Sequence, residues 1–151
     1  MTQGSNELHF FYDAQNKPAV VVYNDIPYSY IKNLQGDIVA ILDSTGTPVV
    51  NYVYDAWGRP ISCSGIMANT LGKINPFRYR GYVYDEETGL YYLRSRYYVS
   101  ANARFLNADI MFTNNLFAYC SNNVINCTDL MGTEEEWLEG WIEPLRKSPR
   151  W

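Results

Sequence analysis

The chain has 151 residues and a formal net charge of −4, and hydrophobic residues make up 47% of it. This acidity excludes a general electrostatic attraction to nucleic acid or to anionic membranes. No apolar run reaches the roughly 18 to 20 residues that span a bilayer, and the N-terminal stretch lacks the basic and apolar regions of a signal peptide. The composition therefore indicates a folded domain with a sizeable core.

The residue types favour β-structure and argue against a metal site. The chain has fourteen tyrosines and only six phenylalanines. Tyrosine suits strands, because its ring packs in the core while its hydroxyl finds a hydrogen-bond partner. Cys63, Cys120 and Cys127 allow one disulfide but no disulfide framework. Together with the lone His9 they are too few and too scattered for zinc. We therefore expect ordinary buried thiols, no metal and no cofactor.

A short motif recurs along the chain. It reads "YDAQNKP" at 12–18, "LDSTGTP" at 42–48, "YDAWGRP" at 54–60 and, with one extra residue before its glycine, "YDEETGL" at 84–90. The aspartate can accept hydrogen bonds from backbone amides ahead of it. The later Gly or Asn can adopt the positive φ that a type I turn with a glycine bulge requires. Each copy therefore predicts a hairpin turn.

Runs rich in Val, Ile and Tyr flank these turns and predict antiparallel strands. Residues 10–105 read as successive hairpins, with 64–75 as a looser connection, so the predicted fold class is mainly β. Side chains should alternate between two faces after the 85–89 turn. The expected faces are Tyr91, Leu93 and Tyr97 on the first, and Tyr92, Arg94, Arg96 and Tyr98 on the second.

The order of these residues resembles a known family. "NLQGDIVAILDSTGTPVVNYVYDAWGRPIS" is similar to the YD repeats of Rhs proteins, and "NPFRYRGYVYDEETGLYYLRSRYYVSANARFLNAD" closely resembles the Rhs repeat-associated core segment. "NLFAYCSNNVINCTDLMG" resembles the stretch that comes after that segment in the family. The resemblance divides the chain into YD-repeat hairpins (1–75), the core segment (76–132) and a C-terminal tail (133–151).

The resemblance also implies a function. Rhs proteins, the C subunits of insecticidal toxin complexes and teneurins wind YD repeats into a hollow β-shell, and bacterial members enclose a C-terminal toxin in it. With three or four repeats, this chain is expected to be the C-terminal end of a longer shell protein or a truncated frame. The expected partners are the remaining shell or an enclosed toxin segment, and the expected location is secreted or at the cell surface.

In this family the core segment can cut the chain just after itself. The matching positions here are Arg96, Asp109 and Asp129, with the scissile bond after Gly132 or Thr133. Two close carboxylates share a proton, so one can activate water while the other donates a proton. The sequence departs from the family pattern in that "IMF" comes after Asp109 and a leucine after Asp129, where the family has proline. The alternative is that both aspartates are turn or capping residues.

The tail is expected to begin with a helix. Thr133 and Glu136 have the spacing of a capping box, and an apolar stripe at helical spacing comes next. The stripe consists of Trp137, Leu138, Trp141 and Ile142. We expect this helix to pack on the β body.

Two other functions remain open on the sequence alone. An extracellular carbohydrate- or protein-binding module is the main alternative, and exposed rows of aromatic side chains would favour it. Arginines interleave with aromatics, as in nucleic-acid sites, but the neighbouring carboxylates favour arginines paired and stacked within the sheet. Any enzymatic activity is expected to be limited to self-cleavage.

Overall fold

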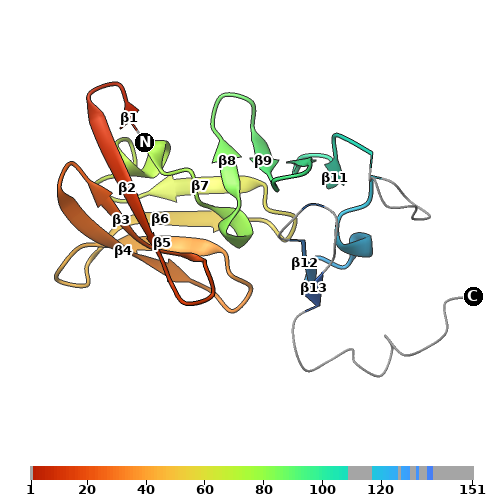
Figure 1. Ribbon diagram of the computed structural model, residues 1–151, viewed down its shortest axis with the longest axis horizontal. Helices are drawn as coiled ribbons and strands as arrows, with labels where there is room; N and C mark the ends of the chain where they lie inside the picture. The colour runs from red at the N-terminus through yellow and green to blue at the C-terminus, as the bar shows by residue number, and fades with distance from the viewer. Residues whose placement is uncertain (1, 109–116, 126, 130–131, 133–135, 138–151) are drawn as a thin grey trace, which may run out of the picture.

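The computed structural model describes residues 2–108, 117–125, 127–129, 132 and 136–137. Its largest part is a seven-stranded antiparallel sheet in which every strand pairs with the next one along the chain (Figure 1). The strands are β1 (Thr2–Gln3), β2 (Asn6–Tyr12), β3 (Pro18–Tyr23), β4 (Ile26–Lys32), β5 (Ile38–Leu42), β6 (Pro48–Tyr54) and β7 (Pro60–Ser64).

The YD motif forms the predicted turns. Oδ1 of Asp13, Asp43 and Asp55 each accepts the backbone N–H groups two and four residues ahead, at 2.9–3.0 Å. The third residue after each aspartate, Asn16 or a glycine, has a φ of 60° to 86°. A register shift precedes each turn, as a bulge requires. The turn prediction is therefore confirmed for these three copies.

A further turn of the same kind was missed by the motif. Oδ1 of Asn33 accepts the N–H groups of Gln35 and Asp37, each at 3.0 Å, and Gly36 has a φ of 88°. The asparagine side chain has an acceptor oxygen at the same position as aspartate. The same turn can therefore form where the motif letters differ.

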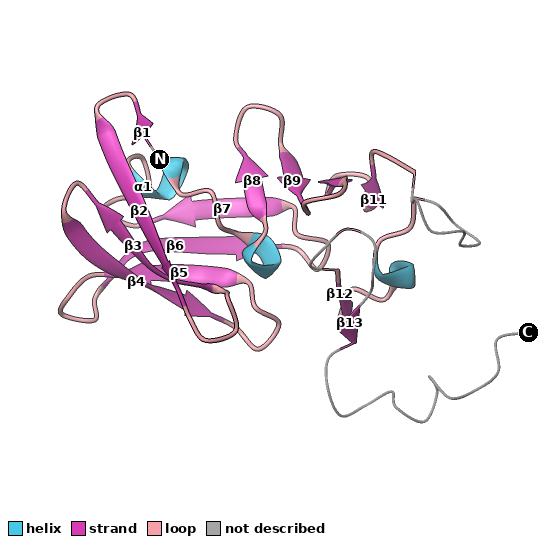
Figure 2. Ribbon diagram, in the orientation of Figure 1, coloured by secondary structure: helices cyan, strands magenta, loops and turns pink. Residues whose placement is uncertain are grey.

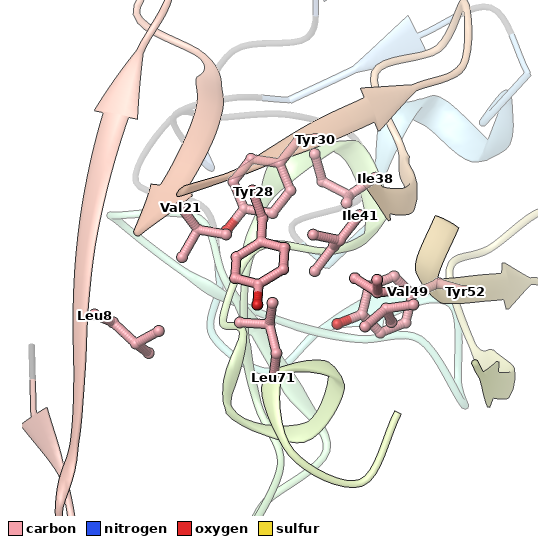
Figure 3. Close-up of a cluster of buried hydrophobic side chains, with 10 residues drawn as sticks. Leu8, Val21, Tyr28, Tyr30, Ile38, Ile41, Val49, Tyr52 and Leu71 are labelled. Carbon is pink, nitrogen blue, oxygen red and sulfur yellow. The ribbon is translucent and has the colours of Figure 1, made fainter. Parts of the chain in front are cut away.

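One face of this sheet carries the first core. Figure 3 shows side chains from β2 to β6 converging with Leu71 of the short helix α1 (Leu71–Ile74). Two tyrosines of this core also bond the α1 region: Tyr30 donates to Oδ1 of Asn75 (2.6 Å) and Tyr52 to the Gly72 carbonyl (2.7 Å). The sequence had predicted only a loose connection here.

The second part of the protein is a smaller sheet beside the first (Figure 2). Its strands are β8 (Val83–Asp85), β9 (Leu90–Tyr92), β10 (Tyr97–Val99) and β11 (Arg104–Phe105), and β12 (Cys127–Thr128) pairs separately with β13 (Glu136–Trp137). Short 3₁₀ helices lie at Tyr79–Gly81 and Cys120–Asn122. The fold is thus mainly β, as predicted. In the described part of the chain, no helix has the length and apolarity to cross a membrane.

The two parts are joined through the 55–59 turn. Three tyrosine hydroxyls of the second part donate to three successive carbonyls of that turn: Tyr79 to Ala56 (2.9 Å), Tyr98 to Trp57 (2.6 Å) and Tyr91 to Gly58 (2.7 Å). These buried or partly buried bonds satisfy turn carbonyls that would otherwise lose hydrogen bonds to water without replacement. The tyrosine richness of the core segment therefore has a structural cause.

The predicted alternation of side chains holds only as far as Leu93. Tyr91 and Leu93 are buried, but Tyr97 is 43% exposed and Tyr98 is fully buried. A tight turn interrupts the strand, with Arg94 at a φ of 65° and the Leu93 N–H donating to the Arg96 carbonyl at 2.9 Å. The turn shifts the alternation by one residue, so the faces predicted for Arg96, Tyr97 and Tyr98 were wrong.

The C-terminal helix and the burial of the cysteines differ in part from what the sequence predicts. Glu136 and Trp137 form β13 rather than the first turn of a helix, because pairing with β12 satisfies their backbone and overrides local helix propensity. The rest of the predicted helix, including Thr133, Leu138, Trp141 and Ile142, lies outside the described residues. Cys120 and Cys127 are buried as expected, but Cys63 is exposed.

Candidate self-cleavage site

Arg96 is the centre of the candidate site. It is the last residue of the 93–96 turn, directly before β10, and its side chain is almost fully buried. The guanidinium carbon lies 3.5 Å from the centroid of the Phe105 ring of β11. A cation over an aromatic face is attracted by the ring quadrupole, and more so when water is excluded. Packing therefore fixes the plane of the guanidinium.

The polar edge of the same guanidinium faces the end of the core segment. Nη2 lies 3.6 Å from Oδ2 of Asp129, and both side chains are at most 5% exposed. Nε donates a hydrogen bond to the carbonyl oxygen of Gly132. The structure thus brings together three of the residues named from the sequence: Arg96, Asp129 and Gly132. Asp109 and Thr133, the other two, lie outside the described residues.

Asp129 differs from the turn aspartates. Hydrogen bonds from neighbouring backbone N–H groups and side chains hold the pKa of Asp13, Asp43 and Asp85 below their usual range at the surface. Asp129 is 1% exposed and ion-paired with Arg96. A buried carboxylate needs such a partner, because desolvation of an isolated charge is costly.

Gly132 occupies a cradle that admits no side chain. Its φ is 72°, and a Cβ built on it would lie 2.6 Å from Oγ of Ser95 and 2.8 Å from the Leu93 carbonyl oxygen. Two independent effects, the left-handed backbone and the close approach, therefore require glycine at this position. The 93–96 turn thereby holds both Arg96 and the backbone that Arg96 bonds.

A hydroxyl network supports Asp129 from the other side. The Asp129 N–H donates to the Tyr82 hydroxyl at 2.9 Å, and that hydroxyl lies 2.9 Å from the Tyr119 hydroxyl and 2.8 Å from Oγ1 of Thr128. Burial raises the pKa of Tyr82 far above its usual value. Sequence reasoning missed these three supporting residues, and no local pattern marks them.

The other buried arginines of the core segment are structural. Arg78 pairs with Glu86 at 2.9 Å, and its guanidinium carbon lies 4.8 Å from the Tyr84 ring centroid. Arg80 pairs with Asp37 at 3.5 Å. The prediction that arginines pair with carboxylates and stack on tyrosines is confirmed for these two. Arg94 and Arg104 are exposed instead.

Comparisons with known proteins agree with this architecture. The family model described as Teneurin YD-shell matches residues 2–130. The tRNA nuclease WapA of Bacillus subtilis (strain 168) is 46% identical over 109 residues, covering 68% of this chain but only 4% of that nuclease. The putative uncharacterized protein YlbH of Escherichia coli (strain K12) is 33% identical over 98 residues, which are 63% of this chain and 39% of YlbH.

Solved structures give the same answer for the fold. The crystal structure of TcdB2-TccC3-Cdc42 superposes with a TM-score of 0.75 at 25% identity, over 85% of this chain and 6% of that one. The Tc holotoxin pore of Photorhabdus luminescens gives a TM-score of 0.76 at 23% identity, over 90% and 7%. The chain thus spans a small part of the relatives it matches, and it belongs to the teneurin YD-shell family.

Proposed function

We propose that this chain is the part of a YD shell that closes over an enclosed toxin segment, and that it cuts its own backbone after Gly132. The remaining shell and that segment would be its partners, in a secreted or cell-surface protein. The family membership and the likeness to Tc toxin structures support the shell role. The resemblance of the core segment supports the cut.

One observation carries the self-cleavage proposal. A single buried guanidinium forms an ion pair with the Asp129 carboxylate and donates a hydrogen bond to the Gly132 carbonyl, which belongs to the peptide bond proposed to break. A hydrogen-bond donor already aimed at that oxygen stabilises the negative charge that develops on it during attack. The same contact holds a carboxylate beside the bond without a separate binding step.

The reaction needs one base and one acid. Water adds its oxygen to the Gly132 carbonyl carbon and gives a proton to one carboxylate. The bond from that carbon to the Thr133 nitrogen then breaks as a protonated carboxyl group gives the nitrogen its proton. Asp129 supplies one of these groups, and Asp109 is the proposed second. Arg96 remains charged throughout, since guanidinium groups are not deprotonated in proteins.

An aspartate replacement tests the proposal. Purified wild-type protein and the Asp129→Asn variant are incubated and their intact masses followed with time. A wild-type fragment ending at Gly132, absent from the variant, is the expected result. Asp43→Asn is the matched control, because it makes the same change in a turn and should leave the cut unaffected. Equal cutting in all three proteins would refute the role of Asp129.

Native mass spectrometry of the cut protein tests enclosure. Because β13 pairs with β12, residues 133–151 should stay bound to the body after the bond is broken. Two separate species under non-denaturing conditions would show that the shell does not retain its C-terminal segment.

The carbohydrate- or protein-binding alternative has one feature in its favour. A cavity of about 560 Å³ lies between the 12–18 turn, the Asn33 turn and the core segment, and Tyr12, Lys17, Tyr92 and Arg94 are among its lining residues. Tyr12 and Tyr92 are exposed, as stacking on a sugar ring would need. Against it, eight of the fourteen tyrosines are buried. Binding to immobilised oligosaccharides that is lost in Tyr92→Ala would support this second function.

A further inference from the structure

Tyr82 contacts Asp129 although the two residues are 47 positions apart. We propose that Tyr82 is a positioning residue for self-cleavage: its hydroxyl fixes the backbone of Asp129 so that the carboxylate stays against Arg96. This inference rests on the proposed self-cleavage and adds a residue to it that is neither an aspartate nor an arginine.

The tyrosine ring is itself held in place. It packs edge-on against Tyr79 at 6.1 Å, Tyr91 at 6.4 Å and Tyr119 at 6.4 Å between ring centroids. Only 5% of the residue is exposed. Because interiors are densely packed, a ring with three such neighbours has little freedom to rotate. Its hydroxyl is therefore a fixed point in the core.

The hydroxyl is used in both of its capacities. Its oxygen accepts the N–H of Asp129, so its own proton is directed to Tyr119 or to Thr128. Tyr119 and Thr128 are buried as well. A network with every member bonded specifies one geometry. The network therefore holds both Thr128, through its side chain, and Asp129, through its backbone N–H.

The geometry makes this anchoring relevant to the chemistry. Arg96 and Asp129 come from different segments, and Nη2 of Arg96 lies 3.6 Å from Oδ2 of Asp129. A shift of the Asp129 backbone would widen that gap. A misplacement of about 1 Å can lower a rate about a hundredfold. The Tyr82 hydroxyl accepts the Asp129 N–H, and burial raises its pKa further above the ordinary value of 10.0, so it acts toward Asp129 as an acceptor and not as a proton source.

The test compares two variants that each lose one buried tyrosine hydroxyl. Tyr82→Phe removes the bond to Asp129. Tyr91→Phe, the matched control, removes a bond to the Gly58 carbonyl and has no bond to the cleavage site. The rate of cutting after Gly132 is measured by intact mass on the full chain, at a temperature where near-UV circular dichroism shows each variant folded. We expect a loss of about ten- to a hundredfold for Tyr82→Phe and less than about twofold for Tyr91→Phe.

A pH series separates positioning from direct proton transfer. Tyr82→Phe should lower the rate by the same factor at every pH and leave the midpoints of the profile in place. If Tyr82→Phe does not fold, the double variant Tyr119→Phe and Thr128→Val takes its place, because it keeps the Tyr82 ring and removes the two side-chain partners that orient its hydroxyl toward Asp129. A loss of severalfold or more is expected there.

The outcomes distinguish the two claims. If the wild-type protein is cut and Tyr82→Phe is cut at the same rate, the positioning role is overturned and self-cleavage stands. Equal losses in Tyr82→Phe and Tyr91→Phe also overturn it, because they assign the effect to general core packing. If the wild-type protein itself is never cut, self-cleavage fails and the positioning role fails with it.

Discussion

A Cβ placed on Gly58 would lie 2.4 Å from Cδ1 of Tyr79, a distance that real Cβ contacts do not reach. Gly58 also has a φ of 86°. The turn of a YD repeat and the core segment therefore meet with no room for a side chain. This contact, with the three tyrosine hydroxyls bonded to the same turn, is how the repeats and the core segment become one folded unit.

Gly58→Ala should destabilise the protein by about 3 kcal/mol or more, because backbone strain and overpacking add. Gly46→Ala is the control: it has a φ of 82° but nothing within 4 Å of its Cβ. It should cost about 1 kcal/mol from the backbone alone. Urea unfolding of the two variants measures the difference, and equal losses would show that the Tyr79 contact is not tight.

Acid should weaken the fold through the turn aspartates. The pKa values of Asp13, Asp43 and Asp85 are lowered by hydrogen bonds to the charged form. A lowered folded-state pKa gives stability that is present above the ordinary value of 3.8 and is lost as the pH falls through the folded value. Urea midpoints between about pH 2 and 6 should drop at the acid end, and less steeply in a variant with all three changed to Asn. An identical acid limb in both proteins would contradict this.

Alkali should act through the buried tyrosines. Burial raises the pKa of Tyr52 to about 12, from an ordinary value of 10.0. The folded state favours the neutral phenol, so stability is present below about pH 10 and is lost as the pH rises toward the folded value. Tyrosinate absorbance should show buried tyrosines ionising together with unfolding. Complete titration of all fourteen near the ordinary pKa of 10.0 in a folded protein would be incompatible with this core.

Gly132→Ala should nearly abolish the cut. The added methyl group meets the Leu93 carbonyl oxygen and Oγ of Ser95, so the Gly132 carbonyl must move away from Arg96. We expect a decrease of about a hundredfold, in line with a displacement of about 1 Å. Gly36→Ala, also at positive φ but with an open Cβ position, controls for backbone strain. A comparable decrease there would point to lost stability instead.

The YD turns could be predicted from the sequence because their physics is local. An acceptor side chain and a residue tolerant of positive φ three positions later are enough. The Asn33 turn falls outside the motif because the motif specifies aspartate, although the Asn33 Oδ1 accepts the same N–H groups. The Asn24–Asp25 turn between β3 and β4, with φ values of 47° and 68°, was not identified either, although paired positive φ is typical of a two-residue hairpin loop.

Features that depend on distant partners could not be read in the same way. The turn at 93–96 interrupts the alternation of side chains along the strand, and the residues "LRSR" contain no pattern that predicts a turn. Strand pairing with β12 decides the conformation of Glu136 and Trp137 against a capping box. At the candidate site, Arg96 and Asp129 came from a family resemblance, and Tyr82 came only from the structure, since its partners lie far away along the chain.

The most direct test of the central claim is the intact mass of the wild-type protein beside Arg96→Gln and the control Arg104→Gln, which changes an exposed arginine of β11. We expect a fragment ending at Gly132 in the wild type and in Arg104→Gln, and none in Arg96→Gln. Uncut chains in all three proteins, or the same fragment in all three, would contradict the claim that Arg96 prepares this bond for cleavage.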